Sequence, residues 1–599
     1  MGGYHGHYLR VDVASGKADW VVLPEPVLRH YLGGVGLGTW LLHREAPLGV
    51  DPLTPGAPLI FCFSPLVGTP LTTSAKFAVV AKSPLTYRLN DALSSSHFAL
   101  AGKRAGADAL VLVGACERPS VLVIDDEGVR VVPAGELWGM TSEEATADLR
   151  KGFGPDYHAA VIGPAGEHLV RYATISHGNR HAGRGGLGAV MGSKRLKAVV
   201  VGGSRRVPLA DADAVARAAK DLSRRSFGPA TAKYRELGTV SNLLTFNRLH
   251  ALPTRNFQAG EFADAEALSG EALNEARRVA RASCASCTIG CEHIYAAPGG
   301  KAVRLEYESL FALGPLCGVG DRDAVLEAAR LCDQYGLDTI STGATIAFAM
   351  ECSERRLIPH GLRFGRGQDL LNLIPLIARR EGLGALLAEG TRRAAEEIGG
   401  DAPAFAPHVK GLEIPGYEPR TLQTMALGFA VGSRGADHNR SGAYEADFST
   451  HADRLRGSAE VAPLAVETED RAALIDSLIL CKFVRGVFTD LYAESAELLR
   501  HVTGWDVTAD ELRRLARRVV CAKKLYNQRE GWTANEDTLP ERFLSERLPA
   551  GADREAALPR ERLRGMVRAY YEARGWDAEG RVPRALIEEL ELSDLVTLG

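Results

Sequence analysis

Three closely spaced cysteines are the residues with the clearest chemical potential. Cys284, Cys287 and Cys291 follow the pattern C-x-x-C-x-x-x-C. Thiolates set this close together can bind an iron–sulfur cluster, whose fourth ligand often comes from a distant part of the chain. Zinc sites usually pair two C-x-x-C units or add histidines at finger spacing, and no second C-x-x-C is present. The pattern favours a cluster, with a zinc site that uses His293, or chance, as the alternatives.

The other cysteines leave the fourth ligand open. The chain has ten cysteines in 599 residues, which is too sparse for a disulfide scaffold. Clustered thiols in a cytoplasmic protein indicate metal binding more than crosslinking. Spacing alone does not choose among the remaining seven.

A glycine-rich segment, Gly183 to Lys194, contains a formal G-x-G-x-x-G. The preceding residues are polar and the strand Ala198–Val201 follows the glycines, so the order required for a Rossmann fingerprint is absent. Free backbone N–H groups beside Arg184, Lys194 and Lys197 would suit a phosphate or another anion. A tight loop between strands is the main alternative, and a dinucleotide site is the weakest.

Two acidic motifs share a spacing. Asp333 and Asp338 follow a predicted helix in the order D-x-x-G-L-D, and Asp476 to Cys481 repeats part of this arrangement. Carboxylates placed this way suit a ligand with a fan of N–H donors, such as the edge of a pterin ring. Ordinary acids at helix ends are the alternative.

The elements that must position these residues differ along the chain. Alternating apolar residues predict short strands in the first 205 residues, at 8–13, 20–23, 110–113, 121–124 and 129–132. Helical spacing then predicts helices at 210–223, 324–335 and 562–574. We therefore predict an α+β protein of three domains: a β-rich domain 1–205 and two mainly helical domains, 206–412 and 413–599.

Composition excludes several classes of function. A net charge of −3 without a basic stripe gives no nucleic-acid footprint. No run of 18 apolar residues and no signal-peptide core is present. We expect a soluble cytoplasmic protein.

Many short motifs, in order, resemble those of the aldehyde:ferredoxin oxidoreductase family of tungsten enzymes, and the match covers essentially the whole chain. The motifs are Tyr31–Gly34, Lys82–Thr86, Gly183–Lys194, Glu306–Glu308, the cysteine run, Asp333–Asp338, Asp437–His438, Asp476–Cys481, Arg529–Gly531, Tyr570–Tyr571 and Arg574–Asp577.

The resemblance implies a β-rich base domain that carries tungsten or molybdenum bound by two pterins. Two mainly helical domains would close over this bis-pterin metal site. The resemblance also names Cys481 as the fourth ligand of a [4Fe-4S] cluster. The implied cofactor-binding residues are Lys76, Ala182, Gly183, Arg184, Gly185, Gly186, Asp333, Asp338, Arg440 and Asp476.

The resemblance further implies an activity, the oxidation of an aldehyde to a carboxylate. His438 would polarise the aldehyde carbonyl while Glu308 deprotonates a water molecule. Two electrons would leave through the cluster to ferredoxin or another one-electron carrier. A homodimer and partner redox subunits are both compatible with the family.

Several positions depart from the family pattern. Leu93 stands where an asparagine helps to ligate magnesium, and Ser95 and Ser96 replace two glycines. Leucine cannot bind magnesium, so the ion is either held by phosphates, water and a carbonyl near Ala182, or missing. Lys76 replaces a common arginine, and Ile479 replaces a glycine of the second acidic motif, which could crowd the pterin.

Other positions leave alternatives open. Cys317 could bring a sulfur near the metal, although a structural role is favoured. Some family members bind a single iron between two subunits through a Glu-x-x-His pair. Here Arg330 stands at the histidine position, so we do not predict that site. The alternative functions are reduction of an aromatic acyl-CoA by a related tungsten enzyme and a pterin-less iron–sulfur electron-transfer subunit.

Overall fold

The N-terminal part of the chain is built on two six-stranded sheets. The computed structural model describes every residue except 179, 360, 553, 598 and 599. The first sheet has the order β2-β1-β6-β3-β4-β5 and the second the order β11-β10-β9-β12-β7-β8. Their strands are β1 (His7–Asp12), β2 (Lys17–Val22), β3 (Leu59–Cys62), β4 (Lys76–Lys82), β5 (Leu89–Ser95), β6 (Ala109–Val113), β7 (Ser120–Asp125), β8 (Gly128–Pro133), β9 (His158–Val161), β10 (Ile175–His177), β11 (Arg180–Ala182) and β12 (Leu196–Val201).

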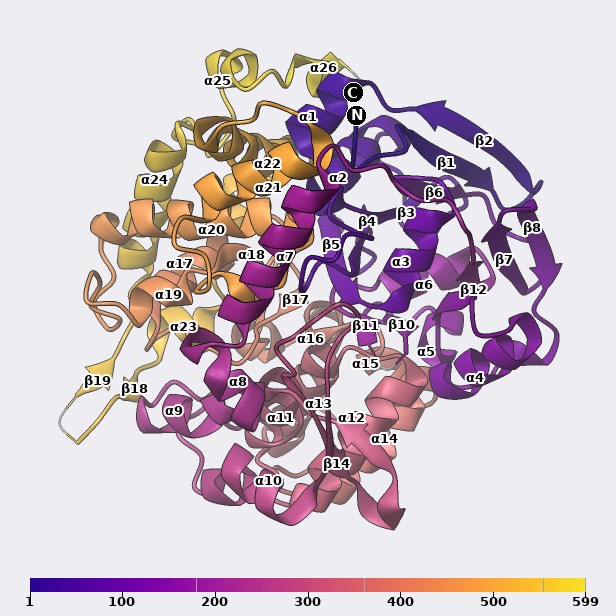
Figure 1. The fold of residues 1–599 in the computed structure, drawn as a ribbon. Helices are drawn as coiled ribbons and strands as arrows, with labels where there is room; N and C mark the ends of the chain where they lie inside the picture. Colours follow the sequence, from indigo (N-terminus) through magenta and orange to yellow (C-terminus); the bar gives the residue numbers. More distant parts are fainter. Residues whose placement is uncertain (179, 360, 553, 598–599) are drawn as a thin grey trace.

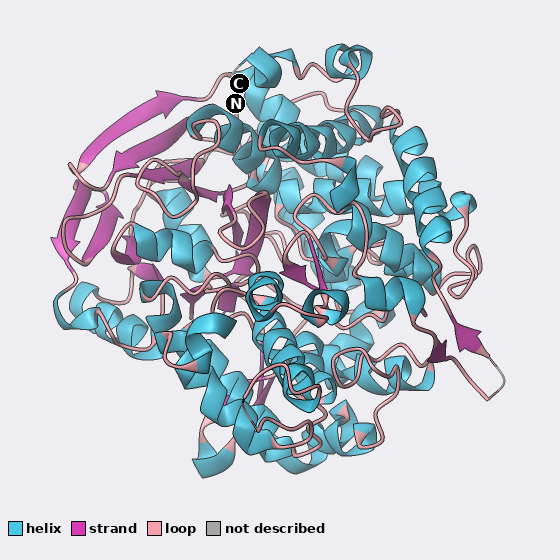
Figure 2. Ribbon diagram, turned by 180° about the vertical axis from the view of Figure 1, so that it is seen from behind, coloured by secondary structure: helices cyan, strands magenta, loops and turns pink. Residues whose placement is uncertain are grey.

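The predicted hairpin at the N-terminus is confirmed. β1 pairs antiparallel with β2, with Leu9 opposite Trp20, and parallel with β6. Tyr8, Leu9 and Val11 are buried, while β2 is the exposed edge strand. Apolar residues packed between the sheets and short helices form the core of this part. Figure 2 shows these strands gathered on one side of the molecule.

Helices dominate the chain after about residue 210, as predicted. The longer ones are α7 (Ala212–Ser226), α12 (Arg322–Tyr335), α13 (Thr339–Glu354), α14 (Gly367–Arg379), α17 (Gln423–Val431), α20 (Ala462–Leu478), α21 (Leu491–Thr503), α22 (Ala509–Arg529) and α24 (Arg560–Arg574). Three small sheets interrupt them and were not predicted. One has three strands, β13 (Arg278–Ala282), β14 (Glu292–Ala296) and β15 (Ala302–Arg304), and two have two strands each, β16 (His408–Val409) with β17 (Leu412–Glu413) and β18 (Leu548–Pro549) with β19 (Glu555–Ala556).

The helical parts close over one side of the first sheet. Helix α2 (Gly34–Glu45) packs between β4 on one side and α20 and α22 on the other. A buried ion pair joins Lys82 to Glu530 at 2.6 Å. Figure 1 shows the indigo sheets, the pink helices and the orange helices meeting at the centre of the molecule. Across the described residues, no helix combines the length and the apolar character needed to cross a membrane.

Candidate active site

A cavity of about 400 Å³ lies where these three parts of the chain meet. Strands β4, β5 and β11, the junction between α12 and α13, and the end of α20 contribute to its walls. Of the sixteen residues predicted to be catalytic, to bind the pterins or to ligate the cluster, twelve line it: Lys76, Gly183, Arg184, Cys284, Cys291, Glu308, Asp333, Asp338, His438, Arg440, Asp476 and Cys481.

The remaining predicted residues lie behind the cavity wall. Ala182 ends β11 and is buried. Gly185 and Gly186 have φ values of 84° and 82°, and a Cβ on Gly185 would lie 2.2 Å from the Asn90 side chain. These glycines therefore form a tight turn that holds Gly183 and Arg184 at the cavity. Cys287 lies beside the other cluster thiols.

The predicted anion cradle is wrong for two of its cations. The Lys194 ammonium donates to the carbonyl of Ala57 at 2.5 Å, and the Lys197 ammonium is buried against Glu167. Both lysine side chains turn into the N-terminal core, because buried carbonyl and carboxylate oxygens there satisfy the ammonium groups. Only Arg184 of the three cations reaches the cavity.

The acids of the cavity stand at helix ends. Helix α12 ends at Gly336, with φ 75°, and Asp338 caps the start of α13 by accepting from Ser341 N at 3.1 Å. Asp333 Oδ1 lies 3.1 Å from His181 Nε2. Asp476, near the end of α20, has a buried Oδ2 atom without a hydrogen-bond partner in the described structure. Such acceptors fit the N–H edge of a pterin ring.

Cations face these acids across the cavity. Arg440 Nε donates to Asp91 Oδ2 at 2.7 Å, and its Nη1 lies 3.4 Å from Asp476 Oδ2. The buried Nε atoms of Arg184 and Arg434 have no hydrogen-bond partner among the described residues. Unsatisfied buried donors are costly unless a ligand meets them. The donor set therefore fits an anionic cofactor with both N–H donors and phosphate oxygens.

Glu308 and His438 form a pair inside the cavity. Glu308 lies in the first turn of α11 (Tyr307–Leu313), where the backbone N–H of Gly416 donates to its Oε2 at 3.0 Å. Glu308 Oε1 lies 3.5 Å from His438 Nδ1. Burial raises the pKa of Glu308 to about 8. Burial, against an opposing effect of Asp437, lowers the pKa of His438 to about 3, so the imidazole is neutral.

Neighbours fix the orientation of His438. The Asn439 amide nitrogen lies 2.9 Å from His438 Nε2, so an amide donating there leaves the ring proton on Nδ1, the atom that faces Glu308. The ring stacks on Tyr417 at 4.9 Å. The pair thus presents one N–H donor and one carboxyl group to the same space.

The predicted cluster thiols lie at one end of the cavity. Backbone Thr73 N donates to Ser286 O at 2.7 Å, and Cys481 N contacts Thr73 Oγ1 at 3.4 Å. One loop from the N-terminal part therefore contacts both thiol-bearing segments. Burial raises the pKa of Cys287 to about 11, and Cys481 and Cys284 add to this effect. Bound iron would be needed to keep such thiols ionised.

The zinc alternative has no support in the structure. His293 instead lies with Nδ1 3.2 Å from Asn274 Oδ1 and Nε2 3.3 Å from the Arg235 carbonyl.

A buried chain of carboxyl groups behind Asp338 was missed in the sequence. Ser341 Oγ lies 2.7 Å from Asp338 Oδ2 and 2.7 Å from Glu413 Oε2. One hydroxyl proton can serve only one of these contacts, so a second proton is required. Burial raises the pKa of Glu413, which favours Glu413 as the group that holds this proton. The signal was hidden because the residues are far apart in the sequence.

Ile479, which could have crowded the pterin, lies outside the cavity lining. Ile479 adopts a left-handed conformation, φ 59°, at the end of α20, a position that favours glycine. Its side chain is buried toward Gly34 and does not line the cavity.

Two further positions are resolved in different ways. Leu93 and Ser95 line the cavity together with Ser94, whose buried hydroxyl has no hydrogen-bond partner in the described chain. Cys317 is fully buried and its thiol contacts the carbonyls of Ala312 and Gly343 at 3.4 Å. A structural role for Cys317 follows, because it lies outside the cavity lining.

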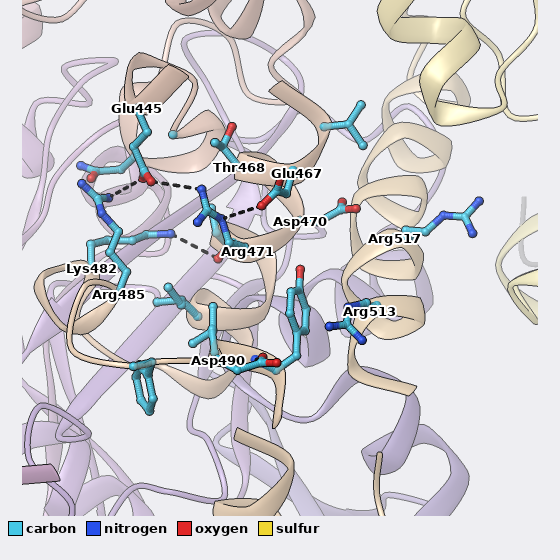
Figure 3. A pocket seen from close by; sticks show the side chains of 18 of the residues that line it. Glu445, Glu467, Thr468, Asp470, Arg471, Lys482, Arg485, Asp490, Arg513 and Arg517 are labelled. Carbon is cyan, nitrogen blue, oxygen red and sulfur yellow. Dashed lines mark hydrogen bonds and ion pairs between the residues drawn. The ribbon is translucent and has the colours of Figure 1, made fainter. Parts of the chain in front are cut away.

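A second hollow, of about 580 Å³, lies on the other side of Asn439 and Lys482, which line both spaces. Figure 3 shows Arg471 between Glu445 and Glu467, with Arg485 also directed at Glu445. The distances from Glu445 to Arg471 and Arg485 are both 3.1 Å. Because Asn439 and Lys482 line both spaces, this charged hollow borders the surroundings of His438.

A β-rich base, helices closed over it, and a cavity of acids, cations and thiols define a cofactor-dependent redox enzyme. Residues 8–203 match the model of the N-terminal domain of aldehyde ferredoxin oxidoreductase, and residues 214–592 match that of its domains 2 and 3. The chain belongs to this family and is an oxidoreductase of the aldehyde ferredoxin oxidoreductase type.

Relatives are similar over their full length. The tungsten-containing aldehyde ferredoxin oxidoreductase of Pyrococcus furiosus is 37% identical over 99% of this chain and 100% of its own. The enzyme of the same name from Thermococcus kodakarensis is 36% identical over 100% of both chains. A WOR-like subunit of an aliphatic sulfonate oxidoreductase from Pyrococcus furiosus is 29% identical over 99% and 98%.

One solved structure has the same fold. The active-site complex BamBC of benzoyl-coenzyme A reductase with 1,5-dienoyl-CoA aligns with a TM-score of 0.84, 22% identity and coverage of 99% and 98%. The predicted α+β fold is therefore confirmed.

Proposed function

We propose that this chain oxidises an aldehyde with water to a carboxylate and passes the electrons to ferredoxin. The cofactors would be a tungsten or molybdenum bis-pterin and a [4Fe-4S] cluster. The observation that best supports this proposal is the Glu308–His438 pair, which lies in a cavity whose acids and cations suit the pterin. Family membership and the names of the relatives point to the same chemistry.

The cofactor-binding roles follow the chemistry of each side chain. Asp333, Asp338 and Asp476 would accept hydrogen bonds from the pterin rings. Arg184 and Arg440 would bind phosphate oxygens, with Lys76 as a third cation. Burial alone would lower the pKa of Lys76, but the Cys481 and Cys284 thiols and Asp476 raise it, so this lysine stays charged between the thiols and the pterin space.

The cluster ligands would be Cys284, Cys287, Cys291 and Cys481. Magnesium has no protein ligand at Leu93, and the free Ser94 hydroxyl would serve the phosphates instead. When bound, the metal–pterin group supplies the acceptor for two electrons.

The catalytic roles rest on the two side chains. Neutral His438 would donate its Nδ1 proton as a hydrogen bond to the aldehyde oxygen. Ionised Glu308 would take one proton from the water as that water adds to the carbonyl carbon. The hydrated aldehyde would then become a carboxylate as its C–H bond breaks, with release of two electrons and two further protons. Acid–base assistance of this kind typically accelerates a reaction by roughly 10²–10⁴-fold. The hollow in Figure 3 would admit the substrate, because Asn439 forms part of both walls.

A substrate screen tests this function. Protein purified without air from tungstate-supplied cells should reduce a viologen dye only when an aldehyde is added, and one carboxylate should appear for every two viologen molecules reduced. The proposal would be contradicted for the aldehydes tested if protein that contains tungsten and iron reduced no dye with any member of a panel of aliphatic and aromatic aldehydes.

A further inference from the structure

Four basic residues lie on the surface next to the cluster cysteines. Lys233, Arg235, Arg278 and Arg281 lie on α8 (Ala232–Leu237) and β13, within a chain whose net charge is −3. We call these four cations, with Phe227 and Val279, the basic patch.

The basic patch adjoins the thiol loop. Arg281 Nε lies 3.7 Å from the position that a Cβ on Gly290 would occupy, and Gly290 is adjacent to Cys291. The other thiol segment is also near, because Tyr234 stacks on Phe483 at 4.1 Å, two residues after Cys481. The basic patch therefore borders both segments that carry the proposed cluster ligands.

The cations of the basic patch have no acidic partners. Across the described residues no ion pair involves any of the four: Arg235 contacts Thr231 Oγ1, and Arg281 donates to the Arg235 carbonyl. Some exposed arginines elsewhere are paired, such as Arg513 with Asp510 and Arg564 with Glu561, so the basic patch differs from them in gathering four unpaired cations in one place. Unpaired charge keeps its full attraction for a partner of opposite sign.

Two exposed apolar side chains accompany these charges. Phe227 is 58% exposed and Val279 is 60% exposed, among few large apolar residues of the described chain with this exposure. The Arg235 guanidinium lies 4.2 Å from the Phe227 ring centroid, so charge and apolar surface are adjacent. Apolar side chains surrounded by polar ones are typical of protein interfaces.

We propose that the basic patch docks a small acidic one-electron carrier protein. This inference rests on the proposed function, in which the oxidation of one aldehyde to a carboxylate releases two electrons and each of two carriers accepts one. The carrier would bring an acidic face to Lys233, Arg235, Arg278 and Arg281 and an apolar residue to Phe227 and Val279. Electrons would then leave where the thiol loop lies closest to the bound partner.

Charge reversal tests the docking site. The variant R235E/R281E should bind a purified acidic two-cluster ferredoxin at least about tenfold more weakly in 50 mM salt, measured by calorimetry. The difference should shrink in 0.5 M salt, because salt screens exposed charges. The control is R150E/K151E on α4 (Ser142–Phe153), where two exposed cations also form no ion pair among the described residues but lie in the N-terminal part.

The outcomes separate the docking site from the proposed function. Unchanged ferredoxin affinity in R235E/R281E, or an equal loss in both variants, would overturn the docking site. Retained aldehyde-dependent reduction of a neutral dye by R235E/R281E, with weakened ferredoxin binding, supports it. If no aldehyde supports dye reduction while R235E/R281E still selectively loses affinity, the docking site stands and the proposed activity fails.

Discussion

His438 Nδ1 lies 3.5 Å from Glu308 Oε1, and neither atom has a hydrogen-bond partner within the described chain. Because neither atom is held by another protein group, both can form hydrogen bonds to a substrate or water molecule that enters the cavity. The pKa of Glu308, about 8, and that of His438, about 3, assign different protonation states to them near neutral pH.

Glu308 should control the pH dependence of aldehyde oxidation. Because burial raises its pKa to about 8, the carboxylate form is lost as pH falls below that value. We expect kcat/KM to rise about tenfold per pH unit below about pH 8 and then to level off. Glu308→Gln should lower kcat by roughly 10²–10⁴-fold and remove this slope. An unchanged slope in the variant, with normal metal content, would contradict the base role.

His438 should act as a neutral hydrogen-bond donor. His438→Phe keeps a ring against Tyr417 but removes the donor, so kcat should fall by roughly 10²-fold or more. The pH dependence should keep the midpoint set by Glu308. Asn439→Leu is the companion variant, because loss of the amide releases the ring tautomer without removing the imidazole. The measurement is the pH dependence of kcat/KM from pH 6 to 9.5. A midpoint in His438→Phe that differs from that of the wild type would contradict the prediction.

Glu413 should tolerate replacement by glutamine. The glutamine amide can accept from Thr391 N, as Glu413 Oε1 does at 2.9 Å, and can donate to Ser341. Glu413→Gln should therefore retain tungsten, whereas Glu413→Ala should lower the free energy of unfolding by about 1–3 kcal/mol. Infrared spectra should show a protonated carboxyl band in the wild type that Glu413→Gln lacks. Tungsten loss in the glutamine variant would indicate that an ionised carboxylate is needed.

Cys481 should be required for the full iron content. Replacing a thiolate ligand by a hydroxyl weakens the binding of iron, so Cys481→Ser should hold clearly fewer than about four irons per chain. Cys317→Ser is the matched control, because that thiol is buried against two carbonyls away from the cavity. Equal iron in both variants, measured by elemental analysis, would remove Cys481 from the ligand set.

Local sequence patterns predicted much of the fold and of the site. Alternation predicted β1 and β2, and helical spacing predicted α12 and α24. β13 was missed because its five residues are largely exposed and carry no alternating apolar signal. This exposed edge strand, β13, carries part of the basic patch.

Contacts between distant residues could not be predicted in the same way. The pairing of Ser341 with Glu413 depends on how α13 packs on the strand β17 (Leu412–Glu413). Lys194 and Lys197 were expected at the glycine loop. Their long side chains are flexible, however, and the ammonium groups bind buried oxygen atoms elsewhere in the N-terminal part. The orientation of Ile479 likewise depends on Gly34, far away in the sequence.

Metal content is the most direct test of the central claim, that the cavity holds a metal–pterin cofactor beside a four-iron cluster. The measurement is elemental analysis of protein purified without air from cells supplied with tungstate and molybdate. We predict about one tungsten or molybdenum and about four irons per chain. Well-folded protein that contains iron but neither heavy metal would contradict the account, because Glu308 and His438 would then have no cofactor beside them.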